Sequence, residues 1–444
     1  VESGVPSHSL VMCGPTGMDV DSGRVAPAER PAGDVVPSSI GNSKAFEINI
    51  RNQYNKLYLS RLQALTPLAL LAGSRKWPAV ASEHVHASLS ELRVRGPGSV
   101  GIAAGCVCKK LAKKKSVLDG LDNFEPLPQL VQHDDCYASE EDEVALEDAS
   151  FRVALGKSGE FWTNFTAGMI VAVHAKVDYT GRFQILDVCL PGYTAPSPQI
   201  AGPGRRLLAL VSGLQPGRGM ATPQALLALQ QFVTGMKEGQ RDVAASITQI
   251  IVAGGTQMET DDEDLGEGSL DQADKFLAAL ATSVPVVIMP GATDSATNQS
   301  LPQAPLGSVC LPYSAQAGAK AVSNPCAMEV AGCKVLGSSG QPVSSVLQFT
   351  NLERPVDALR TCLEARLMAP TAPTELAIAP HVEDPMVIMD NHVPRVMFSG
   401  NHPTFQTDQR EDVVFVCVPA FHQRPAVVLV DLDTLSAEEV VMQV

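Results

Sequence analysis

The chain has 444 residues, of which 45% are hydrophobic and 18% are charged. This composition is typical of a globular protein that buries a large core, and the length favours two domains with flexible segments over one small domain. The formal net charge is −15, so broad, salt-dependent binding of nucleic acid by this chain alone is not expected.

The ten cysteines include Cys106-x-Cys108 but no C-x-x-C pair. Zinc ribbons and thioredoxin-like sites need the two-residue gap, so neither is indicated, and we expect the cysteines to be reduced and mostly buried. No apolar run approaches the roughly 20 residues that span a bilayer, and the N-terminal residues lack a secretory pattern. The sequence therefore predicts no membrane partner.

The first part of the chain is expected to be a tail followed by a helix. Residues 1–40 are rich in glycine, proline and serine and are predicted to be disordered. Residues 46–65 place apolar side chains at helical spacing, and Pro67 is expected to end that helix.

Short alternating segments with turn residues between them follow the helix, and a good hairpin turn lies at residues 178–181. Five such strands predict a small β-barrel of the OB-fold type. Residues 41–194 are thus expected to form the N-terminal helix and OB-fold domain, and residues 195–206 a linker. The predicted strands are residues 99–109, 143–147, 151–155, 170–176 and 183–190.

Residues 207–444 alternate nearly all-apolar strands with helices, which predicts sheets covered by helices in a two-sheet α/β sandwich. The expected helices are residues 223–236, 270–282 and 356–368. The expected strands are residues 207–211, 247–253, 284–289, 334–337, 386–389, 396–399, 413–418 and 427–431.

Four strand ends in this domain resemble the metal-binding turns of calcineurin-like phosphoesterases, with most ligands replaced. The D-x-H, G-D, G-N-H-[DE] and G-H-x-H turns are here SGL, GG, GATD and GNHP. Asp294 and His402 remain as potential ligands, with Asn401 a weak third, and a two-metal site needs more. We therefore expect an inactive phosphoesterase domain without catalytic residues, metal or cofactor. The vestigial metal-site positions are Ser212, Leu214, Gly255, Ala292, Thr293, Asp294, Asn401 and His402.

These features also have plainer interpretations. Asp294 is more often the cap of a turn than a ligand, and the glycine turns are more often tight exits from buried strands. The lysines of residues 109–115 fit either a nuclear-import or nucleic-acid contact or a solvated end of the barrel. The acidic residues 259–264 are expected to form a solvated insertion.

Several segments in the right order resemble the small (B) subunit family of eukaryotic replicative DNA polymerases alpha, delta and epsilon, and within it the delta group most closely. The resemblance runs from about residue 45 to the end of the chain, while residues 1–40 and the acidic insertion depart from it. The segments that carry it include LVSGL at 210–214, SVPVVIMPG at 283–291, LGSSGQPV at 336–343, APTAP at 369–373 and FSGNHPTF at 398–405.

The resemblance implies a non-catalytic accessory subunit of a nuclear DNA polymerase complex. Its implied partners are the cysteine-rich C-terminal domain of the catalytic subunit and a third subunit, with the sliding clamp and DNA reached through the complex. The alternative is a diverged metal-dependent phosphoesterase. A free-standing single-strand-binding OB-fold ranks last, because only 5% of residues are aromatic and the charge is acidic.

Overall fold

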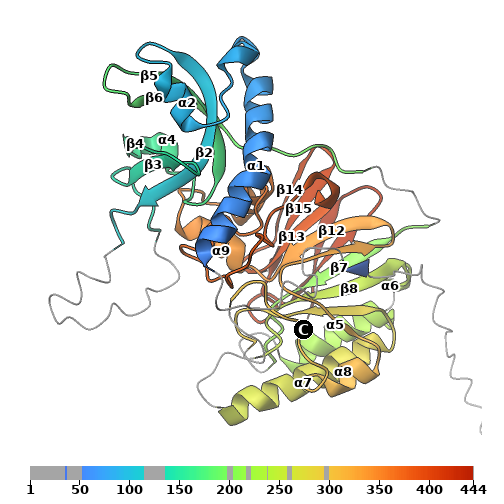
Figure 1. Ribbon diagram of the computed structural model, residues 1–444. Helices are drawn as coiled ribbons and strands as arrows, with labels where there is room; N and C mark the ends of the chain where they lie inside the picture. Colours follow the sequence, from blue (N-terminus) through green and yellow to red (C-terminus); the bar gives the residue numbers. More distant parts are fainter. Residues whose placement is uncertain are drawn as a thin grey trace, which may run out of the picture.

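The computed structural model describes residues 53–114, 136–197, 204–216, 222–237, 239–257, 263–294 and 300–443, and the backbone of Val36–Pro37. The predicted tail therefore lies outside the described residues, apart from the two-residue strand β1 (Val36–Pro37). The described chain forms a barrel and a two-sheet sandwich, with one long helix running alongside both (Figure 1).

That helix, α1 (Tyr54–Lys76), is longer than expected, and the predicted stop at Pro67 is wrong. Proline removes one backbone donor, but the helix continues because its buried face continues beyond Pro67 through Ala69 and Gly73. A Cβ on Gly73 would lie 3.1 Å from Ile102 Cγ2 and 3.2 Å from the Ala172 Cβ. Close packing on the barrel thus outweighs the local effect of proline.

The predicted OB-fold strands are confirmed, with shifts of one or two residues at their ends. All neighbours in this five-stranded sheet are antiparallel, in the order β4-β3-β2-β5-β6. The hairpin is also confirmed: the Asp178 N–H donates to the Arg182 carbonyl at 2.9 Å, and Gly181 has φ +77°. The strands are β2 (Val100–Lys110), β3 (Glu143–Glu147), β4 (Arg152–Lys157), β5 (Ile170–Val177) and β6 (Phe183–Cys189), with η2 (Ser82–His84) and α2 (Leu89–Val94) before β2 and α4 (Gly159–Trp162) after β4.

The second part is a two-sheet α/β sandwich, as predicted. One mixed sheet has the order β10-β9-β8-β7-β16-β17, and its core strands β7, β8 and β9 are parallel. The other has the order β1-β11-β12-β13-β15-β14. The first sheet contains β7 (Leu207–Val211), β8 (Ile247–Ala253), β9 (Val286–Met289), β10 (Lys320–Ala321), β16 (Ala426–Asp431) and β17 (Ala437–Val441), and the second adds β11 (Cys326–Val330), β12 (Cys333–Ser338), β13 (Val396–His402), β14 (Gln406–Arg410) and β15 (Val413–Pro419).

The inner faces of the two sheets pack against each other, with Leu210 and Ile251 in the same core cluster as Phe398 and Val416. Helices cover both outer faces (Figure 1). The first sheet is covered mainly by α5 and α7, and the second by α9 and α10. The helices of this part are α5 (Pro223–Thr234), α6 (Arg241–Ser246), α7 (Glu263–Ala281), α8 (Pro312–Gln316), α9 (Gln341–Gln348), α10 (Pro355–Glu364) and η3 (Asp390–His392).

Two expectations in the sandwich are wrong. Residues 386–389 form no strand, and only Val387 makes a backbone bridge, to Leu367. The helix expected from residue 270 begins at Glu263, so the last residues of the acidic run are helical. The rest of the predicted insertion, up to residue 262, lies outside the described residues.

A buried ion pair joins α1 to the sandwich. Arg61 Nε lies 2.7 Å from Asp384 Oδ2, and the two side chains are 2% and 0% exposed. The same guanidinium donates from Nη1 to the carbonyls of Gly168 in the barrel and Pro370 in the sandwich, at 3.2 and 3.3 Å. One side chain therefore holds three parts of the chain together.

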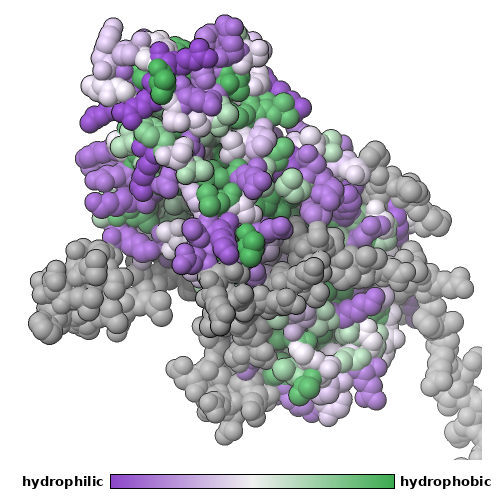
Figure 2. Space-filling view, viewed as in Figure 1, coloured by the Kyte–Doolittle hydropathy of each residue, from purple (hydrophilic) through white to green (hydrophobic). Residues whose placement is uncertain are grey.

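The surface over the barrel and α1 mixes hydrophilic and hydrophobic side chains on the face shown in Figure 2. Among the described helices, none combines the length and apolar character that crossing a membrane requires.

Candidate functional site

The turns after β7, β8, β9 and β13 meet at one edge of the sandwich, where ligands of open α/β sheets usually bind. Ser212 Oγ accepts the Asn401 N–H at 2.8 Å and donates to the Pro419 carbonyl at 3.1 Å. Asn401 Nδ2 donates to the carbonyls of Ala253 and Ser339, at 2.9 and 2.8 Å. Side chains from both sheets are thus bound to backbone of neighbouring strand ends.

Asp294 is buried in the same cluster and accepts five hydrogen bonds. Its carboxylate receives the N–H groups of Gly255, Thr256, Gln257 and Gly291 at 2.8–3.1 Å, and the Thr256 hydroxyl at 2.5 Å. Four of the contacts are backbone N–H groups, which can only donate, so the Thr256 hydroxyl is the one contact of the five that could accept a carboxylic proton. The side chain ties the turn after β8 to the turn after β9.

Two effects act on the pKa of Asp294 in opposite directions. Burial is the larger effect and raises the pKa above its usual value, and the Thr256 hydroxyl and the backbone N–H groups offset part of this rise. Because the four backbone N–H groups can only donate and both carboxylate oxygens accept from them, we assign the carboxylate as the species that holds this turn despite the raised pKa.

Backbone fills the space between these turns. The Gly213 N–H donates to the Gly254 carbonyl at 2.9 Å, and the Gln215 N–H donates to the Gly255 carbonyl at 2.9 Å. A Cβ on Gly255 would lie 2.6 Å from the Gly213 Cα, and one on Gly291 would lie 2.9 Å from the Gly254 Cα. The position that corresponds to the aspartate of the G-D turn therefore has no room for a side chain.

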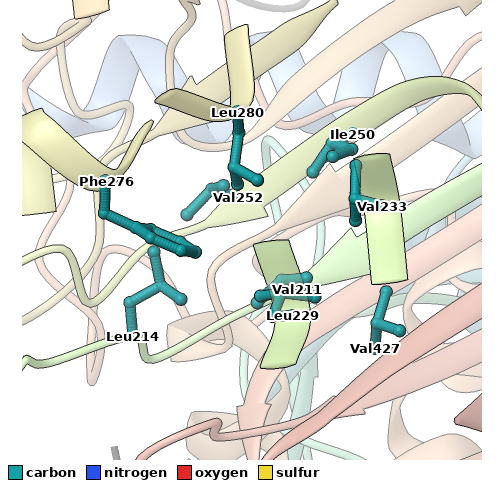
Figure 3. Close-up of a pocket in the computed structure, with 9 residues that line it drawn as sticks. All are labelled: Val211, Leu214, Leu229, Val233, Ile250, Val252, Phe276, Leu280 and Val427. Atoms are coloured by element: carbon teal, nitrogen blue, oxygen red, sulfur yellow. The ribbon is translucent and has the colours of Figure 1, made fainter. Parts of the chain in front are cut away.

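Leu214 is not part of the strand-end cluster. It lines a small apolar pocket between the first sheet and helices α5 and α7, where Phe276 lies next to it (Figure 3). The position that corresponds to the histidine of the D-x-H turn thus belongs to the hydrophobic core. The other residues that line this pocket are Val211, Leu229, Val233, Ile250, Val252, Leu280 and Val427.

The remaining predicted positions lie around the cluster without joining into a site. His402 is buried, its Nε2 lies 2.8 Å from Ser399 Oγ, and burial lowers its pKa to about 4, so the ring is neutral at physiological pH. Thr293 Oγ1 accepts a bond from Gln215 Nε2 at 3.3 Å, and Ala292 is exposed. Within the described ranges, no three His, Cys, Asp or Glu side chains are grouped to hold a metal ion.

A network of buried amides beside the cluster was not predicted. Gln303 Nε2 donates to the Gly291 carbonyl at 3.1 Å, and Asn324 Nδ2 donates to Gln303 Oε1 at 2.7 Å. Asn324 Oδ1 accepts the Ser339 N–H at 3.0 Å, so the network links the ends of β9 and β12. Single amide residues in loops carry no periodic signal from which this network could be predicted.

Comparison with known proteins assigns this fold to a family. The model of the DNA polymerase delta subunit OB-fold domain matches residues 53–188, and that of the small (B) subunit of DNA polymerases alpha and epsilon matches residues 208–407. DNA polymerase delta subunit 2 of Drosophila melanogaster is 32% identical over 418 residues, which cover 88% of this chain and 93% of that protein. The chain belongs to the DNA polymerase delta small-subunit family.

Other relatives match this chain over a similar share of its length. The DNA polymerase delta small subunit of Arabidopsis thaliana is 28% identical and that of Saccharomyces cerevisiae 26%, over 86% and 88% of this chain and 89% of each relative. Among solved structures, an archaeal phosphodiesterase is 11% identical and matches 53% of this chain and 99% of its own. Its TM-score is 0.30, which is too low to support a functional conclusion.

Proposed function

We propose that this chain is a non-catalytic accessory subunit of the nuclear DNA polymerase delta holoenzyme. It acts as a scaffold between the cysteine-rich C-terminal domain of the catalytic subunit and a third subunit. The sliding clamp and DNA are reached through the assembled complex. Family membership over most of the chain is the observation that carries this proposal.

The strand-end cluster supports a role without catalysis. The Ser212 hydroxyl, the Asp294 carboxylate and the side-chain N–H groups of Asn401 are bonded within the protein, and backbone occupies the space at Gly255. A phosphoesterase needs open positions on its metal ions for substrate and water. A strand edge whose polar groups are bonded within the protein is better suited to a structural role than to hydrolysis.

The junction at Arg61 supports the scaffold role. A protein that bridges two partners must hold their binding surfaces at a fixed separation, and Arg61 bonds to both the barrel and the sandwich.

The decisive experiment is reconstitution. The full chain is co-purified with the C-terminal domain of the catalytic subunit, then with the third subunit added, and the mass of each complex is measured by light scattering. We expect stable stoichiometric binary and ternary complexes. A chain that folds and binds neither partner at micromolar concentration would contradict the proposal.

The alternative is a diverged metal-dependent phosphoesterase, which the presence of Asp294 and Asn401 in one cluster keeps open. It predicts Mn²⁺-dependent hydrolysis of a phosphodiester that disappears in Asp294→Ala, and about two metal ions per chain in elemental analysis. We expect neither turnover nor stoichiometric metal in the purified protein.

A further inference from the structure

A cleft of about 740 Å³ lies between the barrel and the sandwich, and this volume is typical of binding sites. Phe165, which follows α4, and Leu190, which follows β6, line it from the barrel. Tyr193 comes from the segment that leaves β6. The cleft thus combines an apolar side with a charged side. The charged residues come from the sandwich and are Arg360 and Glu364 on α10, Arg410 at the end of β14, and Glu411 directly after it.

The charges on the sandwich side are not balanced. Asp408 does not line the cleft, but it accepts from Arg360 Nη1 at 2.8 Å and from Arg410 Nε at 3.2 Å. Both guanidinium groups are therefore paired. Glu364 Oε1 also lies 3.5 Å from Arg360 Nε. The exposed carboxylate of Glu411, by contrast, makes no hydrogen bond or ion pair within the described part of the chain, so it is free to bind a ligand.

The electrostatic field in the cleft is negative at Tyr193. Burial raises the pKa of this phenol to about 12, and the carboxylates of Glu411 and Glu364 add to the rise. The guanidinium groups of Arg360 and Arg410 oppose the two carboxylates with a weaker effect. A cation beside Tyr193 is therefore favoured, and an anion is repelled.

Glu411 also has a backbone conformation that glutamate rarely adopts. Its φ is +48°, in the left-handed region where glycine and asparagine are usual. Residues held in this region cluster at functional sites. The conformation of Glu411 and its unpaired carboxylate are thus two separate observations that point to a ligand at this edge of the cleft.

The barrel side of the cleft suits a long side chain with an apolar stem. The ring centroid of Phe165 lies 5.4 Å from that of Trp162 and 6.1 Å from that of Phe161, which is 50% exposed. Aromatic rings attract cations, and the stems of arginine and lysine pack along apolar surfaces while the charged heads stay in polar surroundings. The two sides of the cleft therefore match the two ends of one basic side chain.

We propose that this cleft binds a basic segment of a partner protein through one inserted arginine or lysine side chain. The stem lies along Phe165 and Leu190, and the cation pairs with the carboxylates of Glu411 and Glu364. The net charge of −15 favours a basic partner over an acidic one. The choice of a protein segment as the ligand rests on the scaffold function proposed above.

Peptide binding to the full chain tests this proposal. The probe is the heptapeptide Gly-Ser-Leu-Arg-Leu-Ser-Gly with a neutral dye, and its fluorescence anisotropy is measured as protein is added. In two matched peptides the arginine is replaced by citrulline, which has a similar shape without the charge, or by glutamate. We expect a Kd of about 100 μM for the arginine peptide and binding at least about tenfold weaker for the other two. Equal binding of the arginine and citrulline peptides, stronger binding of the glutamate peptide, or no saturable binding of the arginine peptide would overturn the proposal.

Matched variants locate the binding. Glu411→Gln and Glu329→Gln each remove one exposed carboxylate, and Glu329 lies on β11, which three strands separate from β14. We expect Glu411→Gln to weaken binding of the arginine peptide about tenfold, and Glu329→Gln to weaken it less than about twofold. Equal losses would mean that the peptide responds only to the net charge of the chain, and would overturn the proposal.

The peptide assay and the reconstitution fail independently. If the polymerase subunits form complexes with the chain but the peptide results are negative, the cleft proposal is wrong and the scaffold function stands. If the arginine peptide binds as expected but neither subunit does, the proposed scaffold function is wrong and the basic-segment site stands.

Discussion

Replacing Arg61 with methionine removes the cation that joins α1, the barrel and the sandwich. The Asp384 carboxylate is then left fully buried, with the Met386 N–H at 2.9 Å among its contacts but no cation. Removing one partner of a buried pair costs about 3–5 kcal/mol, because the other charge stays desolvated. We expect Arg61→Met to lower the free energy of unfolding by about that amount. The double variant Arg61→Met/Asp384→Leu should recover most of the loss, because an apolar pair of similar volume is often neutral.

The two tryptophans make this prediction measurable in urea. Trp162 is buried in the barrel core and Trp77 packs at the end of α1, so fluorescence reports on the barrel, whereas circular dichroism reports on the whole chain. We expect the two transitions to coincide in wild type and to separate in Arg61→Met. The control is Arg152→Met, since Arg152 pairs with Glu147 but is 62% exposed, and it should change stability by less than about 1 kcal/mol. If Arg61→Met shifts the transitions no more than Arg152→Met does, the reasoning about the buried pair is wrong.

Three further predictions concern the strand ends. The pKa of His402 falls from 6.5 to about 4 on folding, so between these pH values the unfolded chain binds more protons than the folded one. The free energy of unfolding should therefore drop by about 3 kcal/mol as the pH falls through this window. His402→Gln should flatten this pH dependence, as measured by urea titrations at several pH values. Gly255→Asp should lower the melting temperature, because its Cβ would lie against the Gly213 Cα, and it should restore no Mn²⁺-dependent hydrolysis. A folded variant that hydrolyses a phosphodiester would show that the strand-end turns can move apart to admit the new side chain and metal ions. Asp294→Asn should destabilise the protein by about 2–4 kcal/mol in urea, because its amide hydrogens would face donors; an unchanged urea midpoint would mean that the five contacts add little.

Secondary structure was predicted most accurately from the sequence where one physical signal dominates. The nearly all-apolar runs of β7 and β8 favoured buried strands, and the hairpin at Gly181 needed a residue that accepts positive φ. The edge strands β14 and β17 were missed because they carry polar and charged residues and lack an apolar run. Pro67 misled the helix prediction, because a local rule cannot include the packing of α1 on two strands.

The candidate site was predictable in part. Parallel strands end at one edge, which is why Asp294 could be expected near the turn after β8. No pattern indicated that its carboxylate would be held by backbone N–H groups, since that depends on how the two turns approach. The place of Leu214 in the core, and the amide network of Gln303 and Asn324, depend on the same three-dimensional arrangement.

The hydrogen bonds of Asp294 bear on how this protein folds in the cell. The turns that would otherwise be drawn together by manganese or iron are joined by peptide N–H groups of the chain itself. On the function proposed above, this domain folds without a metal ion, and a cell starved of these ions is then expected to accumulate the protein at its normal level.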